Sequence, residues 1–113
     1  MVLGAILLFS VAAIFGLWLT VIGARYRRSS VALRLGHAGI AALGLALLAV
    51  QIYRGPIHIL YNDAAGLFVL VIIGGMVLLA LREGNTPPPM VVVGVHGGMA
   101  LVALALVVVG YLQ

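Results

Sequence analysis

The sequence predicts an all-α integral membrane protein whose four helices cross the bilayer up, down, up and down as one bundle. Three observations carry this prediction. Of the 113 residues, 65% are hydrophobic and only 7% are charged, whereas about a quarter of the residues in a soluble domain are charged. Four apolar stretches each have about the 20 residues that a helix needs to span a bilayer. Short polar connections separate them, so consecutive spans run antiparallel.

We expect the spans at about residues 2–24, 31–53, 64–81 and 90–112, within a single domain of residues 1–113. The first span ends at an arginine cluster, and the second ends at Arg54, Gly55 and Pro56. Three consecutive prolines precede the fourth span, and such a run cannot lie inside a helix. The positive charges follow the first apolar run instead of preceding it, so we expect that span to be retained and not cleaved as a signal peptide.

The arginines predict how the bundle is oriented. Five of the six arginines lie in or near the first and third connections, and only Arg54 lies near the second connection. The positive-inside rule then places both connections in the cytoplasm and both termini on the non-cytoplasmic side. The absence of lysine and the richness in Ala, Gly, Val and Arg favour a bacterial inner membrane. Because the arginines flank apolar segments, they indicate contacts with lipid headgroups and no nucleic-acid binding.

Composition also excludes several function classes. The chain has no cysteine, which excludes disulfides, thiolate metal sites and covalent haem attachment. Only two residues are acidic, Asp63 and Glu83, and serine and threonine are scarce. Most hydrolase chemistry is therefore excluded, because its catalytic groups are missing.

The chain contains an internal repeat. Residues 37–48, which begin at His37, align without gaps with residues 96–107, which begin at His96, and glycines flank both histidines. Counting back from each histidine reaches an arginine-bearing loop and a further apolar span. We therefore predict two parallel helical hairpins related by an axis along the membrane normal.

The two repeated histidines are the candidate site. Ionisable side chains within spans usually face the bundle interior, where they bind or pair. His37 and His96 should lie at similar depth near the cytoplasmic face, and they can hold the metal of a flat macrocycle from both sides. The alternative is that each histidine only hydrogen-bonds to a neighbouring helix.

Small residues follow each histidine at helical spacing. Ala41 and Gly44 share the face of His37, and Ala100 and Ala103 share the face of His96. Such residues give clearance to the edge of a macrocycle, although they also let membrane helices pack closely without any ligand.

Cationic side chains lie near the predicted site. Arg34 precedes His37 by one turn and is placed to pair with a carboxylate of the ligand through a charge-assisted hydrogen bond. Arg28 and Arg82 are placed to assist from the connections.

His58 lies on the opposite side of the membrane and has no partner histidine. A structural role is the default expectation. The functional alternative is a quinone headgroup or proton-transfer site with Asp63, Tyr53 and Tyr61, because imidazole and carboxylate groups exchange protons near neutral pH.

With this histidine pair and its flanking glycines and alanines, the chain resembles the bis-histidine b-type membrane cytochromes, which are transmembrane four-helix haem bundles of cytochrome b561-like architecture. The resemblance implies one haem b per chain, with His37 and His96 as its iron ligands. It implies an electron-transfer protein and not an enzyme in its own right, working between the quinone pool and a redox-partner protein. Many relatives hold two haems on two histidine pairs, whereas this chain has one pair.

Other functions fit the same residues. The main alternative is a non-catalytic accessory or assembly subunit of a larger membrane complex, and the chain is also compatible with a homodimer. Transport is a smaller alternative, since paired repeats occur in transporters. A tetrapyrrole other than haem, such as a chlorophyll held by one histidine, also suits the site.

Overall fold

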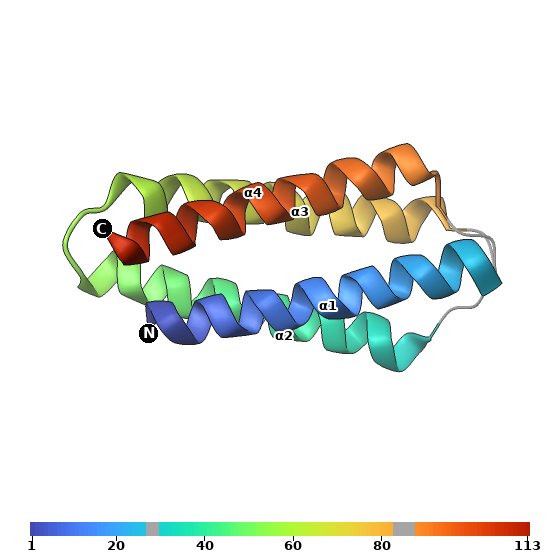
Figure 1. Ribbon diagram of the computed structural model, residues 1–113, viewed down its shortest axis with the longest axis horizontal. Helices are drawn as coiled ribbons and strands as arrows, with labels where there is room; N and C mark the ends of the chain where they lie inside the picture. The colour runs from blue at the N-terminus through green and yellow to red at the C-terminus, as the bar shows by residue number, and fades with distance from the viewer. Residues whose placement is uncertain (27–29, 83–87) are drawn as a thin grey trace.

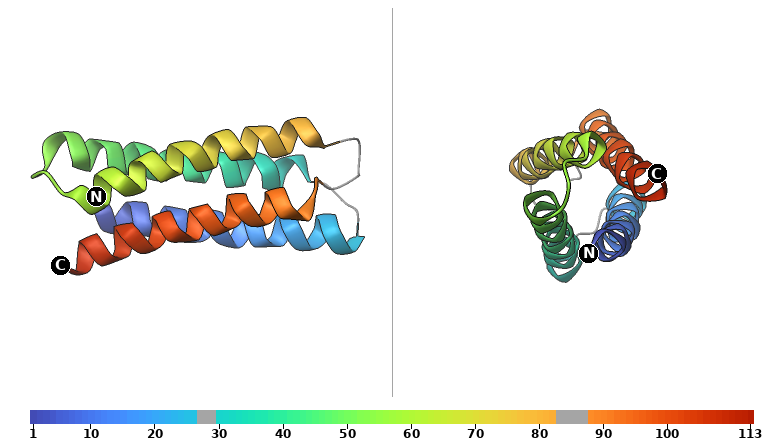
Figure 2. Two further views of the ribbon diagram at one scale, coloured as in Figure 1. Left: turned by 90° about the horizontal axis from the view of Figure 1, so that it is seen from above. Right: turned by 90° about the vertical axis from the view of Figure 1, so that its left-hand side faces the viewer.

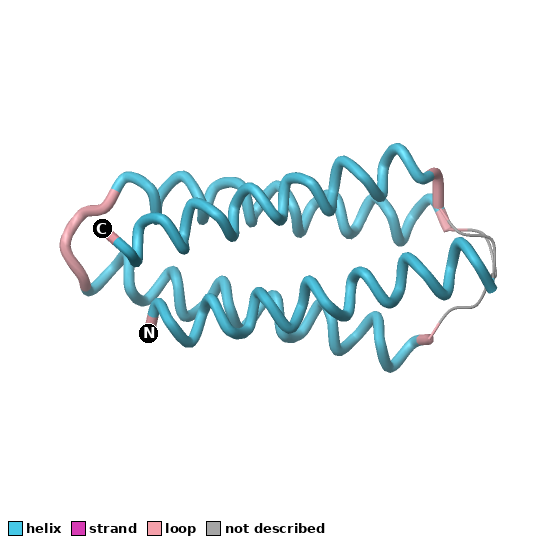
Figure 3. The backbone as a smooth tube through the Cα atoms, viewed as in Figure 1, coloured by secondary structure: helices cyan, strands magenta, loops and turns pink. Residues whose placement is uncertain are grey.

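The structure is a computed structural model that describes residues 1–26, 30–82 and 88–113. Four α-helices follow one another along the chain: α1 (Val2–Tyr26), α2 (Val31–Arg54), α3 (Ile59–Leu81) and α4 (Met90–Leu112). The described residues contain no strand, as Figure 3 shows. Each helix is long and apolar enough to cross a membrane. The prediction of an all-α fold with four helices long and apolar enough to cross a membrane is therefore confirmed.

The helices form an elongated bundle of 45 × 23 × 20 Å. In Figure 1, α1 and α3 run away from the end that carries both termini, and α2 and α4 run back toward it. α1 packs mainly against α2, and α3 packs mainly against α4. The end-on view in Figure 2 places α2 diagonally opposite α4, and α1 diagonally opposite α3. The bundle is thus two helical hairpins side by side.

Local sequence sets the helix ends. The Ser30 hydroxyl accepts a hydrogen bond of 3.2 Å from the backbone N–H of Leu33, which caps the N-terminus of α2. At the other end of α2, the Gly55 N–H donates to the Gln51 carbonyl at 2.8 Å. Pro89 directly precedes α4, since proline lacks the N–H that the interior of a helix requires.

The third helix begins at Ile59, earlier than the Ala64 that the sequence pattern predicted. Its first turn forms because the backbone N–H groups of Tyr61 and Asn62 donate to the His58 carbonyl at 3.1 and 3.2 Å. The Asn62 side chain is exposed. Polar residues that suggested a loop therefore lie on the outside of a helical turn.

The core combines small side chains with two stacked aromatic rings. Phe9 and Phe68 have ring centroids 3.7 Å apart and planes within 10°, so they join the two hairpins at the bundle centre. The hydroxyls of Ser10 and Thr20 donate to carbonyls one turn earlier in α1, which satisfies them without water. Large apolar side chains such as Leu7, which is 58% exposed, lie on the outside. An apolar exterior of this kind suits a lipid environment.

Candidate functional site

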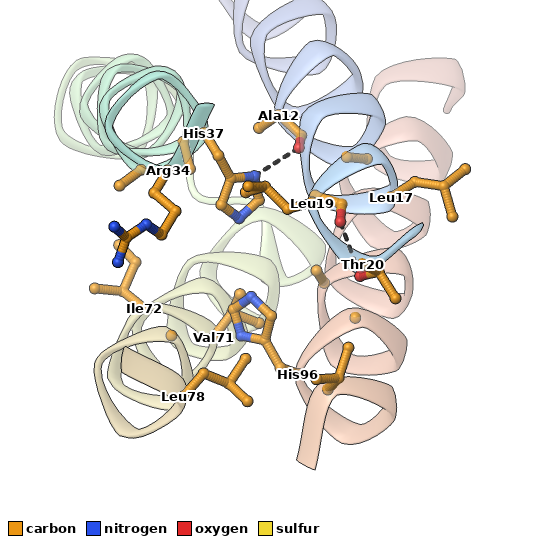
Figure 4. A pocket seen from close by; sticks show the side chains of 18 of the residues that line it. Ala12, Leu17, Leu19, Thr20, Arg34, His37, Val71, Ile72, Leu78 and His96 are labelled. Atoms are coloured by element: carbon orange, nitrogen blue, oxygen red, sulfur yellow. Dashed lines mark hydrogen bonds between the residues drawn. The ribbon is translucent and has the colours of Figure 1, made fainter. Parts of the chain in front are cut away.

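Two histidines from diagonally opposite helices face each other inside the bundle. His37 projects from α2 and His96 from α4, and Figure 4 shows their rings pointing toward one another. The ring centroids are 6.2 Å apart and the ring planes make an angle of 67°. Both side chains are half-buried. The structure thus brings together the two histidines that the internal repeat singled out.

A cavity of about 940 Å³ surrounds the two rings. All four helices contribute to its wall, which consists mostly of apolar side chains. The stacked Phe9 and Phe68 rings line its inner part, and Arg34 and Arg82 line it toward the opposite end of the bundle. This volume lies at the upper end of the range for small-molecule sites, about 300 to 1,000 Å³. The cavity is therefore large enough for a cofactor.

The spacing of the two rings suits a metal ion between them. Two imidazoles on opposite sides of one metal have ring centroids roughly 6 Å apart, because each metal–nitrogen bond is about 2 Å and each ring adds about 1 Å. Within residues 1–26, 30–82 and 88–113, no group of three or more His, Cys, Asp or Glu side chains is assembled. The two histidines would then offer such a metal two ligands, which suits a bound molecule that brings ligand atoms of its own. A tetrapyrrole fits, because its four nitrogens leave two opposite axial positions.

A hydrogen bond fixes the orientation of His37. Its Nδ1 lies 2.7 Å from the backbone carbonyl oxygen of Ala12 in α1. A carbonyl only accepts, so Nδ1 carries the proton and Nε2 keeps its lone pair. In Figure 4 that second nitrogen is directed toward His96. His37 is therefore held in the tautomer that a metal ligand requires.

Glycines let α1 and α3 approach the two rings closely. A Cβ atom on Gly16 of α1 would lie 2.9 Å from Cε1 of His37, a distance that real Cβ contacts essentially never show. On α3, Cβ atoms on Gly74 and Gly75 would each lie 3.4 Å from a His96 ring atom. Any larger residue at position 16 would have to displace the His37 ring.

Two cationic side chains lie together at one end of the cavity. Arg34 is half-buried, and its Nε is shielded from solvent and has no hydrogen-bond partner among the described residues. Burial, and next the positive charge of Arg34, lower the pKa of Arg82, which caps the C-terminus of α3. Two neighbouring cations of this kind favour an anionic group between them. This end of the cavity can therefore bind a carboxylate.

The other predicted site residues divide into two groups. Ala41 and Ala100 line the cavity that also holds the histidines. Gly44 and Ala103 do not line it: a Cβ on Gly44 would lie 2.9 Å from the Phe9 ring, and Ala103 is fully buried in the core. Both follow their histidine by seven residues, about two turns, which brings them level with the phenylalanine pair. Arg28 lies outside the described residues.

The sequence analysis did not identify several residues that shape the site, namely Ala12, Gly16, Gly75 and the two phenylalanines. The sequence contains a pattern that points to the glycines and the phenylalanines among them. Gly16 and Gly75 are separated by 59 residues, as are Phe9 and Phe68, and this is also the separation of His37 and His96. Extending the repeat back through the preceding span would have identified them as paired positions.

The third histidine lies at the other end of the bundle. His58 stacks on Tyr61 with ring centroids 4.4 Å apart and planes within 25°. Tyr53 is 89% exposed, and Asp63 is exposed as well. Of the three side chains named with His58, the structure brings only Tyr61 into a described contact with its ring.

Comparison of the chain with protein-family models, with curated proteins and with solved structures finds no match.

Proposed function

We propose that the protein is a small membrane electron carrier that holds one haem b between His37 and His96. One observation carries this proposal: two imidazoles from diagonally opposite helices face each other at 6.2 Å inside a cavity of about 940 Å³. When bound, haem b supplies one-electron redox chemistry through its iron. If His37 and His96 both hold the iron, outer-sphere electron transfer would be favoured over oxygen activation.

The protein supplies orientation, clearance and an apolar wall. Gly16 of α1 and Gly75 of α3 lie beside the two histidine rings, so no side chain at these positions would obstruct a flat ligand held between α2 and α4. Ala41 and Ala100 provide similar room on the ligand-bearing helices. The Phe9 and Phe68 rings separate the site from the other half of the bundle and exclude water from it.

Arg34 and Arg82 bind the propionates of the haem in this proposal. Both line the same end of the cavity, and their mutual repulsion is relieved by two carboxylates. Neutralised propionates also help to set the redox potential of the iron.

The four helices cross the membrane up, down, up and down as two parallel hairpin repeats in this proposal. The support is that six pairs of buried residues recur at the 59-residue separation of the two histidines. They are Val2 and Tyr61, Ala5 and Ala64, Phe9 and Phe68, Ala12 and Val71, Gly44 and Ala103, and Leu48 and Val107. An approximate two-fold axis along the bundle then relates the hairpins.

The proposed location is a bacterial inner membrane, with the haem near the cytoplasmic face and both termini on the other side. Arg25, Arg34 and Arg82 lie toward the end of the bundle where α1 ends, and Arg54 lies at the opposite end. This asymmetry supports that orientation. The quinone pool and a redox-partner protein are the proposed electron donor and acceptor, either for this chain alone or within a larger complex.

The deciding experiment is a dithionite-reduced minus oxidised absorbance spectrum of the protein purified in detergent, combined with a pyridine haemochrome assay. We expect a sharp low-spin b-type signal at one haem per chain. The haemochrome separates haem b from other tetrapyrroles. A protein that stays colourless after haem is offered would contradict the proposal and favour an accessory or assembly subunit, with co-purifying partners as its second sign.

Gly16→Ala should weaken haem binding by about tenfold or more, the usual effect of disturbing a group that orients a metal ligand. The new methyl group would lie 2.9 Å from Cε1 of His37 and must push the ring away from the Ala12 carbonyl. The measurement is a haem titration of the apoprotein, followed in the Soret band.

Gly39→Ala is the matched control, because a Cβ at that position of α2 meets nothing within 4 Å. Alanine also favours helix over glycine, so neither variant should lose helix content by circular dichroism. Equal haem affinities for the two variants would contradict the proposed fit between α1 and His37.

A further inference from the structure

The cavity around the two histidines reaches the outside of the bundle. Met76 of α3 lines this cavity, and its side chain is nevertheless 67% exposed. Ala38 and Ala42 of α2 also line the cavity and are exposed as well. A residue that lines a cavity and is exposed at the same time lies where the cavity is open. The exterior of the helices suits lipid, so an opening on the side of the bundle leads into the bilayer.

The residues on α2 place this opening on the flank of the helix that faces α3. A Cβ on Gly36 would lie 3.1 Å from the Phe15 ring, so the flank with Gly36 faces α1. Ala38 comes two residues later, and Ala42 comes one turn beyond it. Both therefore lie on the opposite flank, which faces α3 in the end-on view of Figure 2.

The residues on α3 lead to the same opening. A Cβ on Gly74 would lie 3.4 Å from the His96 ring, so the flank with Gly74 faces α4. Met76 comes two residues later and lies on the opposite flank, toward α2. We call the opening bordered by Ala38, Ala42 and Met76 the α2–α3 mouth. Among neighbouring helix pairs, α2 and α3 also share the least contact.

A second opening, the α1–α4 mouth, is bordered by larger side chains. Leu17 of α1 and Leu101 of α4 both line the cavity and are 67% and 60% exposed. Leu17 precedes Met76 by 59 residues, the separation of the two histidines. Leu101 follows Ala42 by the same separation. Two branched leucines thus stand where the α2–α3 mouth has a small alanine and a flexible, unbranched methionine. A flat molecule therefore passes the α2–α3 mouth more easily.

Charge also distinguishes the two mouths. Arg34 lines the cavity one turn before Ala38, and its Nε is shielded from solvent without a hydrogen-bond partner among the described residues. Val93 of α4, which follows Arg34 by 59 residues, lines the cavity without a charge. A carboxylate that passes the α2–α3 mouth therefore meets a guanidinium group, with which it forms a charge-assisted hydrogen bond.

We propose that the site is loaded from the bilayer, and that haem dissolved in the lipid enters sideways through the α2–α3 mouth. This inference rests on the proposed function. Haem is a flat apolar ring that carries two carboxylates, so it matches a mouth with an apolar border and a cation beside it. Entry from lipid also keeps the ring out of water. The passage transfers no electron and no proton.

The experiment measures how fast haem enters the full-length apoprotein, held in lipid nanodiscs and supplied with haem from phosphatidylcholine vesicles. Entry is followed in the Soret band. Ala42→Leu places at the α2–α3 mouth the residue that borders the other mouth, and it should slow entry by about tenfold. Met76→Ala widens the α2–α3 mouth and should speed entry. The haem affinity should change little in either variant, because an obstacle on the path slows entry and exit alike.

Leu101→Ala is the matched control, because it widens the α1–α4 mouth and should leave the entry rate nearly unchanged. Equal acceleration by Leu101→Ala and Met76→Ala would overturn the choice of mouth. Entry rates that neither Ala42→Leu nor Met76→Ala alters would overturn lateral entry and favour entry from the end of the bundle. A wild type that binds no haem would contradict the proposed function itself, so the two failures are distinguishable.

Blocking the mouth after folding covers the case in which a variant fails to fold. The chain has no cysteine, so Ala42→Cys supplies a single thiol at the α2–α3 mouth. The folded apoprotein is modified with a bulky apolar maleimide before haem is offered. Modification should slow entry by about tenfold relative to the unmodified variant. Leu101→Cys, modified in the same way, should change little. Equal slowing of both variants, or of neither, would overturn the inference.

Discussion

Replacing either His37 or His96 by alanine should abolish the low-spin haem spectrum. The two rings enter the cavity from opposite helices, and their 6.2 Å spacing leaves room for one metal centre between them. Removing one ring leaves a single protein ligand, so the iron can no longer be six-coordinate through two histidines. The measurement is the reduced minus oxidised spectrum of each variant, normalised to protein concentration.

His58→Ala is the matched control for both substitutions. It removes the same side chain from the other end of the bundle, where His58 stacks on Tyr61. We expect this variant to keep the low-spin signal at one haem per chain. Retention of the low-spin signal in both His37→Ala and His96→Ala would rule out the assigned ligands, and loss of the signal in His58→Ala would place His58 in the site.

Phe9→Ala should destabilise the bundle by about 3 kcal/mol, within the range for emptying a buried aromatic site. Phe9 is 4% exposed and Phe68 is 5% exposed, and their stacked rings join the two hairpins across the bundle centre. Phe9 also covers Gly44 of α2. In a membrane the loss is mainly one of van der Waals packing, since lipid is as apolar as the core. The measurement is the free energy of unfolding, obtained in mixed micelles with increasing dodecyl sulfate and followed by circular dichroism.

Leu7→Ala serves as the control, because Leu7 lies on the same helix and is also large and apolar but is 58% exposed. This control substitution should lower the free energy of unfolding by no more than about 0.5 kcal/mol. The double variant Phe9→Ala and Phe68→Ala should cost about 1 kcal/mol less than the two single changes added together, because each ring stacks only on the other. Equal effects at Phe9 and Leu7, or full additivity of the two phenylalanines, would contradict this account of the core.

Much of the helical architecture follows from local sequence. The arginine cluster after α1, the Gly55 and Pro56 pair after α2 and the proline run before α4 mark helix ends that the structure places within a few residues of the prediction. The start of α3 was missed because Asn62 lies in the first helical turn with its side chain outside. A polar residue at the end of a span looks the same in the sequence whether it caps a helix or belongs to a loop.

The site was predicted less completely than the helices. His37, His96, Arg34, Ala41 and Ala100 were all identified from the sequence and all line one cavity. Gly44 and Ala103 share a helix face with their histidines, but a helical face extends beyond the cavity. The Phe9 and Phe68 rings close the inner end of the cavity, so they determine how far along α2 and α4 a residue can line it. These rings come from α1 and α3, not from the helices that carry the histidines.

The sequence by itself determined that this chain forms four helices long and apolar enough to cross a membrane, because apolar length and polar breaks act locally. It also singled out His37 and His96, because similar residues surround both of them at a separation of 59 residues. Only the tertiary structure decided which surfaces meet. The approach of Gly16 to His37, the bond from His37 to the Ala12 carbonyl and the stacking of Phe9 on Phe68 all arise between separate helices. Such contacts depend on how backbones pack against one another, and no single helix encodes that packing.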